Sequence, residues 1–233
     1  MTVREHDVPG IMERCRSLET NGKNGGTANG EPPAPPNEPA EVPEGVRLYS
    51  DLFSASHRVQ MYTGNLVPGV LQTVEYACAL LTALTPSVMP HMTQDQAYYR
   101  VNQGRELRSD YRRGVRMVLN ESVLHQQMGA PVNVLSGQLE YLVTAISGNP
   151  QWSVQLLPSS SPLNAMQQFT TFHLVGGQTV VHAEPFGECA FSNDPPLLAR
   201  RLDAFERLQA AALGPAESME RIIQRLRETW CVR

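Results

Sequence analysis

Long hydrophobic runs are missing from this chain of 233 residues. Its longest apolar stretches, such as residues 77–81, are far shorter than the roughly 20 residues that a helix needs to cross a bilayer. The N-terminus also lacks the basic and then apolar pattern of a signal peptide. We therefore expect a cytoplasmic protein without a membrane partner.

Cysteine is scarce, and the standard catalytic motifs are absent. Cys15, Cys78, Cys189 and Cys231 are scattered, with no C-x-x-C pair and no histidine at metal-ligand spacing. This pattern predicts neither a disulfide framework nor a zinc site. No Walker loop, Rossmann glycine pattern, H-E-x-x-H helix or Ser-His-Asp order is present. We expect no metal and no cofactor.

Positive charge does not exceed negative charge, because the 19 lysines and arginines, of which Lys23 is the only lysine, stand against 23 acidic residues. Residues 1–45 contain four basic and eight acidic groups, which accounts for the whole net charge of −4 and leaves the remainder neutral. Such a chain lacks the broad basic surface that supplies most nucleic-acid affinity. The one basic cluster, residues 100–116, is interrupted by acidic residues and is typical of a solvated face. Direct nucleic-acid binding is not expected.

Residues 1–45 are predicted to form a disordered arm. Eleven of the 24 residues at positions 22–45 are Gly or Pro, and almost none can be buried. Such a segment cannot offset the entropy lost on ordering. A short helix over residues 8–19, capped by Asp7, is compatible with the pattern, but an isolated helix of this length is marginal.

Residues 46–233 have the composition of a folded domain. Helical periodicity predicts helices at 47–62, 70–81, 93–110, 134–146 and 195–212, and a last helix that carries residues 219–226. Alternating polarity predicts strands at 114–119, 152–156, 169–175 and 178–183, and a short helical turn at 121–124. The predicted fold is therefore a single α+β domain, with a small and mainly antiparallel sheet packed by helices from both ends of the chain.

Several short motifs occur in a specific order along this domain. They are LVPGVLQTVEYA (66–77), LNESVL (119–124), GQLEYL (137–142), VQLLP (154–158), VHAE (181–184) and AFERLQAAALGPAESMERI (204–222). Together they resemble the domain that follows the helix-turn-helix in WhiJ-like, antitoxin-like transcription regulators of actinobacteria. The resemblance spans roughly residues 49–223. It implies a regulatory domain that senses a signal or binds a small partner protein.

The chain departs from that family in four respects. The DNA-binding module is missing, since 45 residues rich in Gly and Pro cannot hold its packed helices. Phe53 stands where an acidic residue is usual in the first helix. Ser159–Pro162 replaces a Gly and a His, and His182 replaces the usual Tyr. The resemblance therefore implies a regulator-family domain without DNA-reading helices.

A predicted hairpin supplies the first candidate site. If Gly176-Gly177 forms a two-residue turn, His173 and His182 share one face as diagonal neighbours about 7 Å apart, followed by Glu184. Two histidines and a carboxylate suit acid/base or ligand contact, and in principle a facial metal triad. The alternative is that these side chains only satisfy local hydrogen bonds.

Further candidates precede and follow the predicted strands. Glu121 comes just after a strand, where a buried carboxylate would have a raised pKa and serve as a general acid or base, or would simply cap the next turn. Gln72 and Tyr76 follow a Pro-Gly pair at a helix start, where free backbone N–H groups receive anions. Their alternative role is to fix the helix entry. Arg100 joins them as a ligand-binding candidate.

Two functional hypotheses follow. The first is a stand-alone regulator-family domain that binds a small partner protein or a small ligand. The second is a small natural-product enzyme of the cyclase or isomerase type. In that enzyme, Glu121, His173, His182 and Glu184 would carry proton transfer in a repurposed ligand pocket.

Overall fold

A mixed six-stranded sheet runs through the middle of the computed structural model, which describes residues 44–84, 90–109, 113–183 and 190–230. The strands are β1 (Ser56–Thr63), β2 (Gly114–Asn120), β3 (Trp152–Leu157), β4 (Phe169–Leu174), β5 (Thr179–Ala183) and β6 (Ala190–Ser192). Their order is β3-β2-β1-β4-β5-β6. β2 is parallel to both β1 and β3, whereas β4 is antiparallel to β1 and to β5, and β6 is antiparallel to β5.

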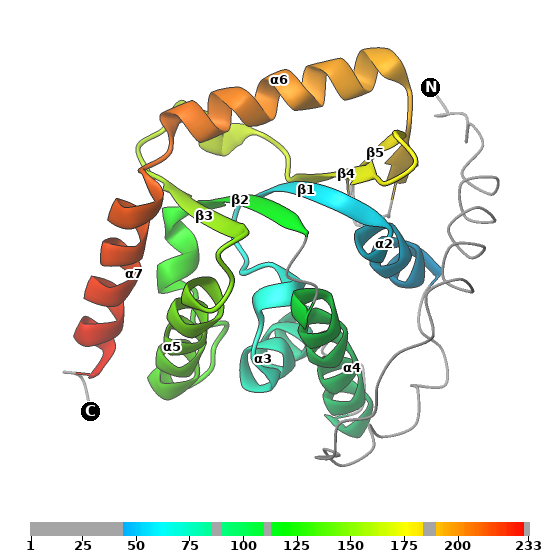
Figure 1. Ribbon diagram of the computed structural model, residues 1–233. Helices are drawn as coiled ribbons and strands as arrows, with labels where there is room; N and C mark the ends of the chain where they lie inside the picture. The colour runs from blue at the N-terminus through cyan, green and yellow to red at the C-terminus, as the bar shows by residue number, and fades with distance from the viewer. Residues whose placement is uncertain (1–43, 85–89, 110–112, 184–189, 231–233) are drawn as a thin grey trace.

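Helices cover the two faces of the sheet unequally (Figure 1). The helices are α2 (Glu44–Ser54), α3 (Val74–Leu84), α4 (Pro90–Ser109), α5 (Val132–Ser147), α6 (Pro195–Ala211) and α7 (Pro215–Trp230). Three short 3₁₀ turns are η1 (Gly69–Leu71), η2 (Glu121–His125) and η3 (Pro162–Ala165). α2 to α5 lie below the sheet in Figure 1, while α6 crosses the opposite face. This arrangement confirms the predicted α+β domain.

Two apolar cores result from the alternation of side chains along the strands. Val59 and Met61 of β1 belong to the larger core, together with Leu139 of α5 and Ile222 of α7. Tyr62 faces the other way and belongs to a smaller core under α6. That core consists of Tyr62, Val118, Leu157, Phe169, Val181, Ala204, Phe205 and Leu208. Because both faces of the central strands are buried, these strands are held rigidly between the two cores.

The helix predicted at 47–62 is wrong, because α2 ends at Ser54 and the chain continues as β1. The guanidinium of Arg113 lies at this junction and donates hydrogen bonds to the carbonyls of Ser54 and Ser56 at 2.8 and 2.9 Å. Pairing of β1 with β2 and β4 outweighs the local helical pattern. The helix predicted at 70–81 is likewise divided into η1 and α3.

The β4–β5 hairpin differs from the predicted two-residue turn. Leu174 N–H donates to Gln178 O at 2.8 Å and Gly177 N–H donates to Leu174 O at 3.0 Å, so the loop has three residues. Gly177 has a φ of 83°, the conformation that such a loop requires of its last residue. The register moves by one residue, and His173 and His182 therefore lie on opposite faces of the sheet.

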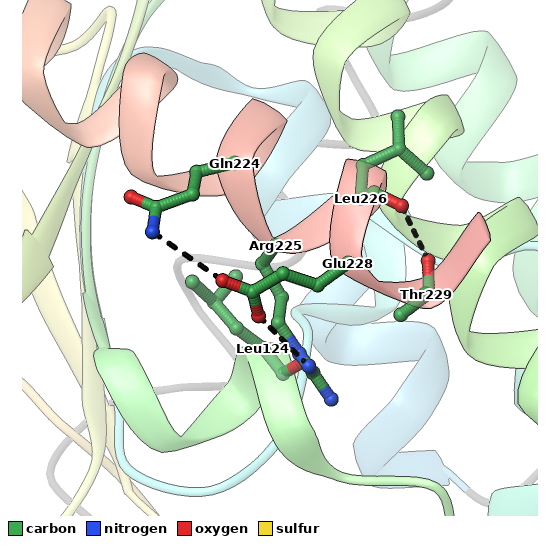
Figure 2. A network of polar contacts seen from close by, with 6 residues as sticks. All are labelled: Leu124, Gln224, Arg225, Leu226, Glu228 and Thr229. Atoms are coloured by element: carbon green, nitrogen blue, oxygen red, sulfur yellow. Dashed lines mark hydrogen bonds and ion pairs between the residues drawn. The ribbon is translucent and has the colours of Figure 1, made fainter. Parts of the chain in front are cut away.

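The C-terminal helix α7 is attached to η2 by side-chain hydrogen bonds (Figure 2). Arg225 Nε donates to Leu124 O at 3.2 Å, and its Nη1 lies 3.0 Å from a carboxylate oxygen of Glu228. Gln224 Nε2 donates to the other oxygen of Glu228 at 3.3 Å. The hydrogen bond from Arg225 to Leu124 O therefore joins α7 to η2, while the other two contacts lie within α7.

Two further expectations concern the N-terminal arm and the membrane. The predicted arm and its short helix over residues 8–19 lie outside the described residues. Among the residues that are described, no helix is long and apolar enough to cross a membrane.

Candidate functional site

A cavity of about 270 Å³ lies between α2, α4, η1 and the strands β1, β4 and β5. Its walls are largely apolar and include Val46, Met61, Leu66, Val67, Leu80, Leu107 and Phe169. Polar side chains also line it, namely Tyr49, Ser50, Tyr62, Thr63, Gln72, Arg100, Gln103, Gln168, Thr170 and His182. The cavity is thus an apolar space with a small set of hydrogen-bonding groups.

One wall exists because α4 packs unusually close to η1. A Cβ atom added to Gly104 would lie 2.9 Å from both Cα and O of Val70, so only glycine permits this approach. Arg108 donates to the same carbonyl of Val70, and Arg100 Nη1 donates to Gln72 Oε1 at 3.4 Å. α4 and η1 therefore form a fixed wall.

Two buried glutamines hold η1 in place. Gln72 is 2% exposed, and its Nε2 donates to Val67 O at 2.7 Å. Gln138, which is fully buried on α5, donates to Leu71 O at 2.7 Å and accepts from Thr73 N–H at 2.8 Å. Since an unpaired buried amide group is costly, this pairing specifies the turn between η1 and α3.

The predicted anion site at the start of this helix is occupied by the protein's own groups. Tyr76 N–H donates to Thr73 Oγ1 at 3.2 Å, the arrangement of an N-cap. The Tyr76 hydroxyl accepts from Val67 N–H at 3.5 Å, and burial raises the pKa of this phenol. Tyr76 is 1% exposed and supports the wall from behind, whereas Gln72 reaches the cavity itself.

The opposite wall is α2, which is joined to its surroundings by side-chain hydrogen bonds. Ser50 Oγ donates to Gln103 Oε1 at 2.9 Å, and Gln103 Nε2 donates to Tyr99 OH at 2.6 Å. The Tyr49 hydroxyl lies 3.3 Å from Thr170 Oγ1 of β4. The polar bridges therefore connect α2 to α4 and to the sheet around the cavity.

His182 lies on the cavity side of β5. It is 6% exposed and packs between the rings of Tyr49 and Phe191, with centroid distances of 5.0 and 4.7 Å. Burial lowers its pKa from 6.5 to about 4. The imidazole is consequently neutral at pH 7, where it has one nitrogen that donates and one that accepts.

His173 lies on the opposite face of the sheet, where it pairs across the strands with Arg58 of β1. Its Nε2 donates to Gln60 Oε1 at 2.9 Å, which leaves Nδ1 to accept from Thr179 Oγ1 at 3.3 Å and Arg58 Nη2 at 3.4 Å. Burial, followed by the charges of Arg58 and His57, lowers its pKa from 6.5 to about 4. The pair that was predicted to share one face is therefore divided between two.

Glu121 lies away from the cavity, in η2. One of its carboxylate oxygens accepts from Ser159 N–H at 3.2 Å and the other lies 3.6 Å from Arg221 Nη1. Asn120, not Glu121, caps the turn, because its side chain accepts from Ser122 N–H at 2.8 Å. Glu184, the remaining acidic candidate, lies outside the described residues.

Three of the candidates line the cavity: Gln72, Arg100 and His182. Sequence reasoning missed Tyr49 and Thr63. The helix predicted at 47–62 ran through α2 and most of β1 and stopped one residue before Thr63, so neither residue was placed at a site. The described part of the chain contains no group of three His, Cys, Asp or Glu residues that could hold a metal ion.

The chemistry of the cavity is that of binding through shape and a few hydrogen bonds. Among the described lining residues there is no Asp or Glu, and Arg100 is the only charged side chain. Thr63 Oγ1 is buried and has no hydrogen-bond partner within the described residues. Apolar walls with a few convergent polar groups are typical of small-molecule sites.

Fold and site together define an α+β domain with a cavity on the helix-rich face of its sheet. A family model for a domain of unknown function, DUF5753, matches residues 46–224. This match covers most of the chain, from α2 to the middle of α7, and the protein belongs to the DUF5753 family. No curated protein matches the chain.

Proposed function

We propose that this chain is an effector domain that binds a small molecule in the cavity between α2, α4 and the sheet. The observation that carries the proposal is the composition of that cavity, in which apolar walls surround the side chains of Thr63, Gln103 and Thr170. Such a site accepts a largely apolar ligand whose few polar atoms meet these groups. The resemblance to WhiJ-like regulators supports a sensing role.

The buried hydroxyl of Thr63 defines one expected contact. A ligand carbonyl or hydroxyl at this position would satisfy Oγ1, which lacks a partner among the described residues. Arg100 and Gln72 supply further donors and acceptors on the opposite wall. The ligand is therefore expected to be a compact apolar body with oxygen atoms at its edge.

Two variants on α2 test the proposal. Ser50 lines the cavity and Ser54 is exposed on the same helix. Ser50→Trp should fill the space between α2 and α4, whereas Ser54→Trp adds the same side chain to solvent. A small-molecule fragment library is screened by ligand-observed NMR against the full chain, and each hit is repeated with both variants.

The proposal expects hits that bind the wild type and Ser54→Trp but not Ser50→Trp. Binding that survives in a folded Ser50→Trp protein would refute the cavity as the site. So would the absence of any hit at millimolar fragment concentration. A variant with a smaller change, Thr63→Val, removes only the hydroxyl and should weaken oxygen-bearing hits by roughly tenfold.

Regulation through direct DNA binding is not part of this proposal. The net charge of these 233 residues is −4, and a neutral to acidic chain lacks the electrostatic term on which most DNA affinity depends. A gel shift with the purified protein and the DNA upstream of its own gene tests this point. Tight sequence-specific binding would overturn it.

The enzyme hypothesis is favoured by one observation, the neutral imidazole of His182 beside Tyr49 in the cavity. A neutral imidazole can accept a proton from a bound ligand, so His182 would act as a general base. Each fragment or metabolite that binds is incubated with catalytic amounts of protein, and its NMR spectrum is followed. Conversion that His182→Asn abolishes would support an enzyme, and unchanged ligand would favour the sensing role.

A further inference from the structure

The face of the sheet that α6 crosses is covered only in part. α6 buries Tyr62, Val118 and Phe169 through Phe205 and Leu208. Beyond these apolar residues, the strand residues on the same face are polar. We call these residues the cationic strip: Arg58 and Gln60 of β1, Arg116 of β2, His173 of β4 and Thr179 of β5.

Strand register brings the two arginines of the strip together. Arg58 pairs with Gly114 of β2, and Arg116 pairs with Gln60 of β1. Arg58 and Arg116 are therefore diagonal neighbours on one face of two parallel strands. Both side chains are exposed, and the missing side chain of Gly114 leaves room between them.

Their charges are not neutralised by the described chain. Arg58 contacts the neutral ring of His173, and neither arginine forms an ion pair with a carboxylate of the described residues. The ring of His57 lies 6.4 Å from that of His173. Like charges at neighbouring positions destabilise a sheet, so this strip would be stabilised by an acidic partner.

We propose that the acidic segment of this same chain, residues 31–43, docks on the cationic strip. Glu31, Glu38 and Glu41 give the segment three negative charges, and it contains no Lys or Arg. The described domain begins with α2, directly after this segment. Charge complementarity and covalent linkage thus act together, because a tethered segment has a high effective concentration.

Glu31, at the far end of the segment, is within reach of Arg58 even over the longest path. α2 has 11 residues and is about 16 Å long, and the four further residues to Arg58 add at most about 13 Å. The path from Glu44 to Arg58 is therefore no more than roughly 30 Å. An extended, Pro-rich chain advances about 3 Å per residue, so the 13 residues from Glu31 to Glu44 span about 40 Å.

The experiment compares two charge variants of the full chain by NMR. The test variant carries Glu31→Gln, Glu38→Gln and Glu41→Gln. The control carries Glu5→Gln, Glu13→Gln and Glu19→Gln, which removes the same charge from the earlier part of the same terminal region. Backbone amide and arginine Nε resonances of the strip are recorded at low salt and in about 0.5 M NaCl, where exposed charge pairs are screened.

Docking predicts that the test variant and high salt move the resonances of Arg58, Arg116 and His173 in the same direction, while the control variant leaves them in place. Arg58→Gln combined with Arg116→Gln should shift the amides of residues 31–43 in return. Strip resonances that are identical in wild type and test variant at low salt would overturn the proposal. Shifts that grow with protein concentration would also overturn it, because they would assign the segment to a second copy.

Discussion

Replacing Gly104 by alanine tests the close contact that forms the rigid wall of the cavity. The new Cβ would lie 2.9 Å from Cα and O of Val70 and 3.2 Å from its carbonyl carbon. These are backbone atoms, so no side-chain rotation can relieve the clash. α4 must move away from η1, which also weakens the hydrogen bond from Arg108 to Val70 O.

The magnitude follows from two opposing effects. Alanine in a helix interior is more favourable than glycine by about 1 kcal/mol, whereas overpacking of a tight contact costs about 1–3 kcal/mol. We expect Gly104→Ala to lower the free energy of unfolding by up to about 2 kcal/mol, since backbone on both sides must give way. For a domain of this size, each kcal/mol corresponds to roughly 2–4 °C in Tm.

A matched control is present in α5. A Cβ on Gly137 meets nothing within 4 Å, so Gly137→Ala should raise the free energy of unfolding by about 0.5–1 kcal/mol through helix propensity alone. Both variants are measured by urea denaturation followed by circular dichroism. A Gly104→Ala protein that is as stable as Gly137→Ala would refute the close packing of α4 on η1.

Three further changes have defined outcomes. Gln138→Leu leaves the carbonyl of Leu71 and the N–H of Thr73 unpaired and should cost about 2–4 kcal/mol in denaturant unfolding, with Gln209→Leu on α6 as a control. Arg113→Met removes the donor to three backbone carbonyls and should lower the free energy of unfolding by at least about 3 kcal/mol. A melting temperature equal to that of the wild type would show that water can hydrogen-bond these carbonyls instead. His173 and His182 have pKa values of about 4 in the fold against 6.5 unfolded, so the unfolded state binds more protons between these values. Stability should hold above pH 6.5 and fall toward pH 4 by up to about 3 kcal/mol per histidine, and His182→Asn should remove its share.

Much of the fold could be predicted because local patterns and tertiary packing agree. α5 shows a helical period, and its predicted apolar positions Leu135, Leu139 and Leu142 are buried. Strands β2 to β5 lie close to where alternating polarity and flanking turn residues predicted them, although both of their faces are largely buried. In these segments the sequence carries the same information that the packed structure uses.

The candidate site was less predictable, for two physical reasons. The loop is one residue longer than predicted, and this difference places His182 on the face opposite to His173. Sequence alone does not distinguish a two-residue Gly-Gly turn from a three-residue loop that ends in Gly177. β1 carries no strong alternation, and its strand conformation comes from pairing with β2 and β4. Tyr49 and Thr63 could therefore not be placed beside a cavity in advance.

Chemical-shift mapping of a bound fragment tests the central claim most directly. A fragment that binds the full chain is titrated into isotope-labelled protein, and amide shifts are followed to saturation. Binding in the cavity predicts the largest changes at Tyr49, Thr63, Gln103 and His182, with little change at Arg116 on the far face of the sheet. Changes centred on Arg116, or shifts that leave Thr63 and Gln103 unmoved, would contradict a small-molecule site in this cavity.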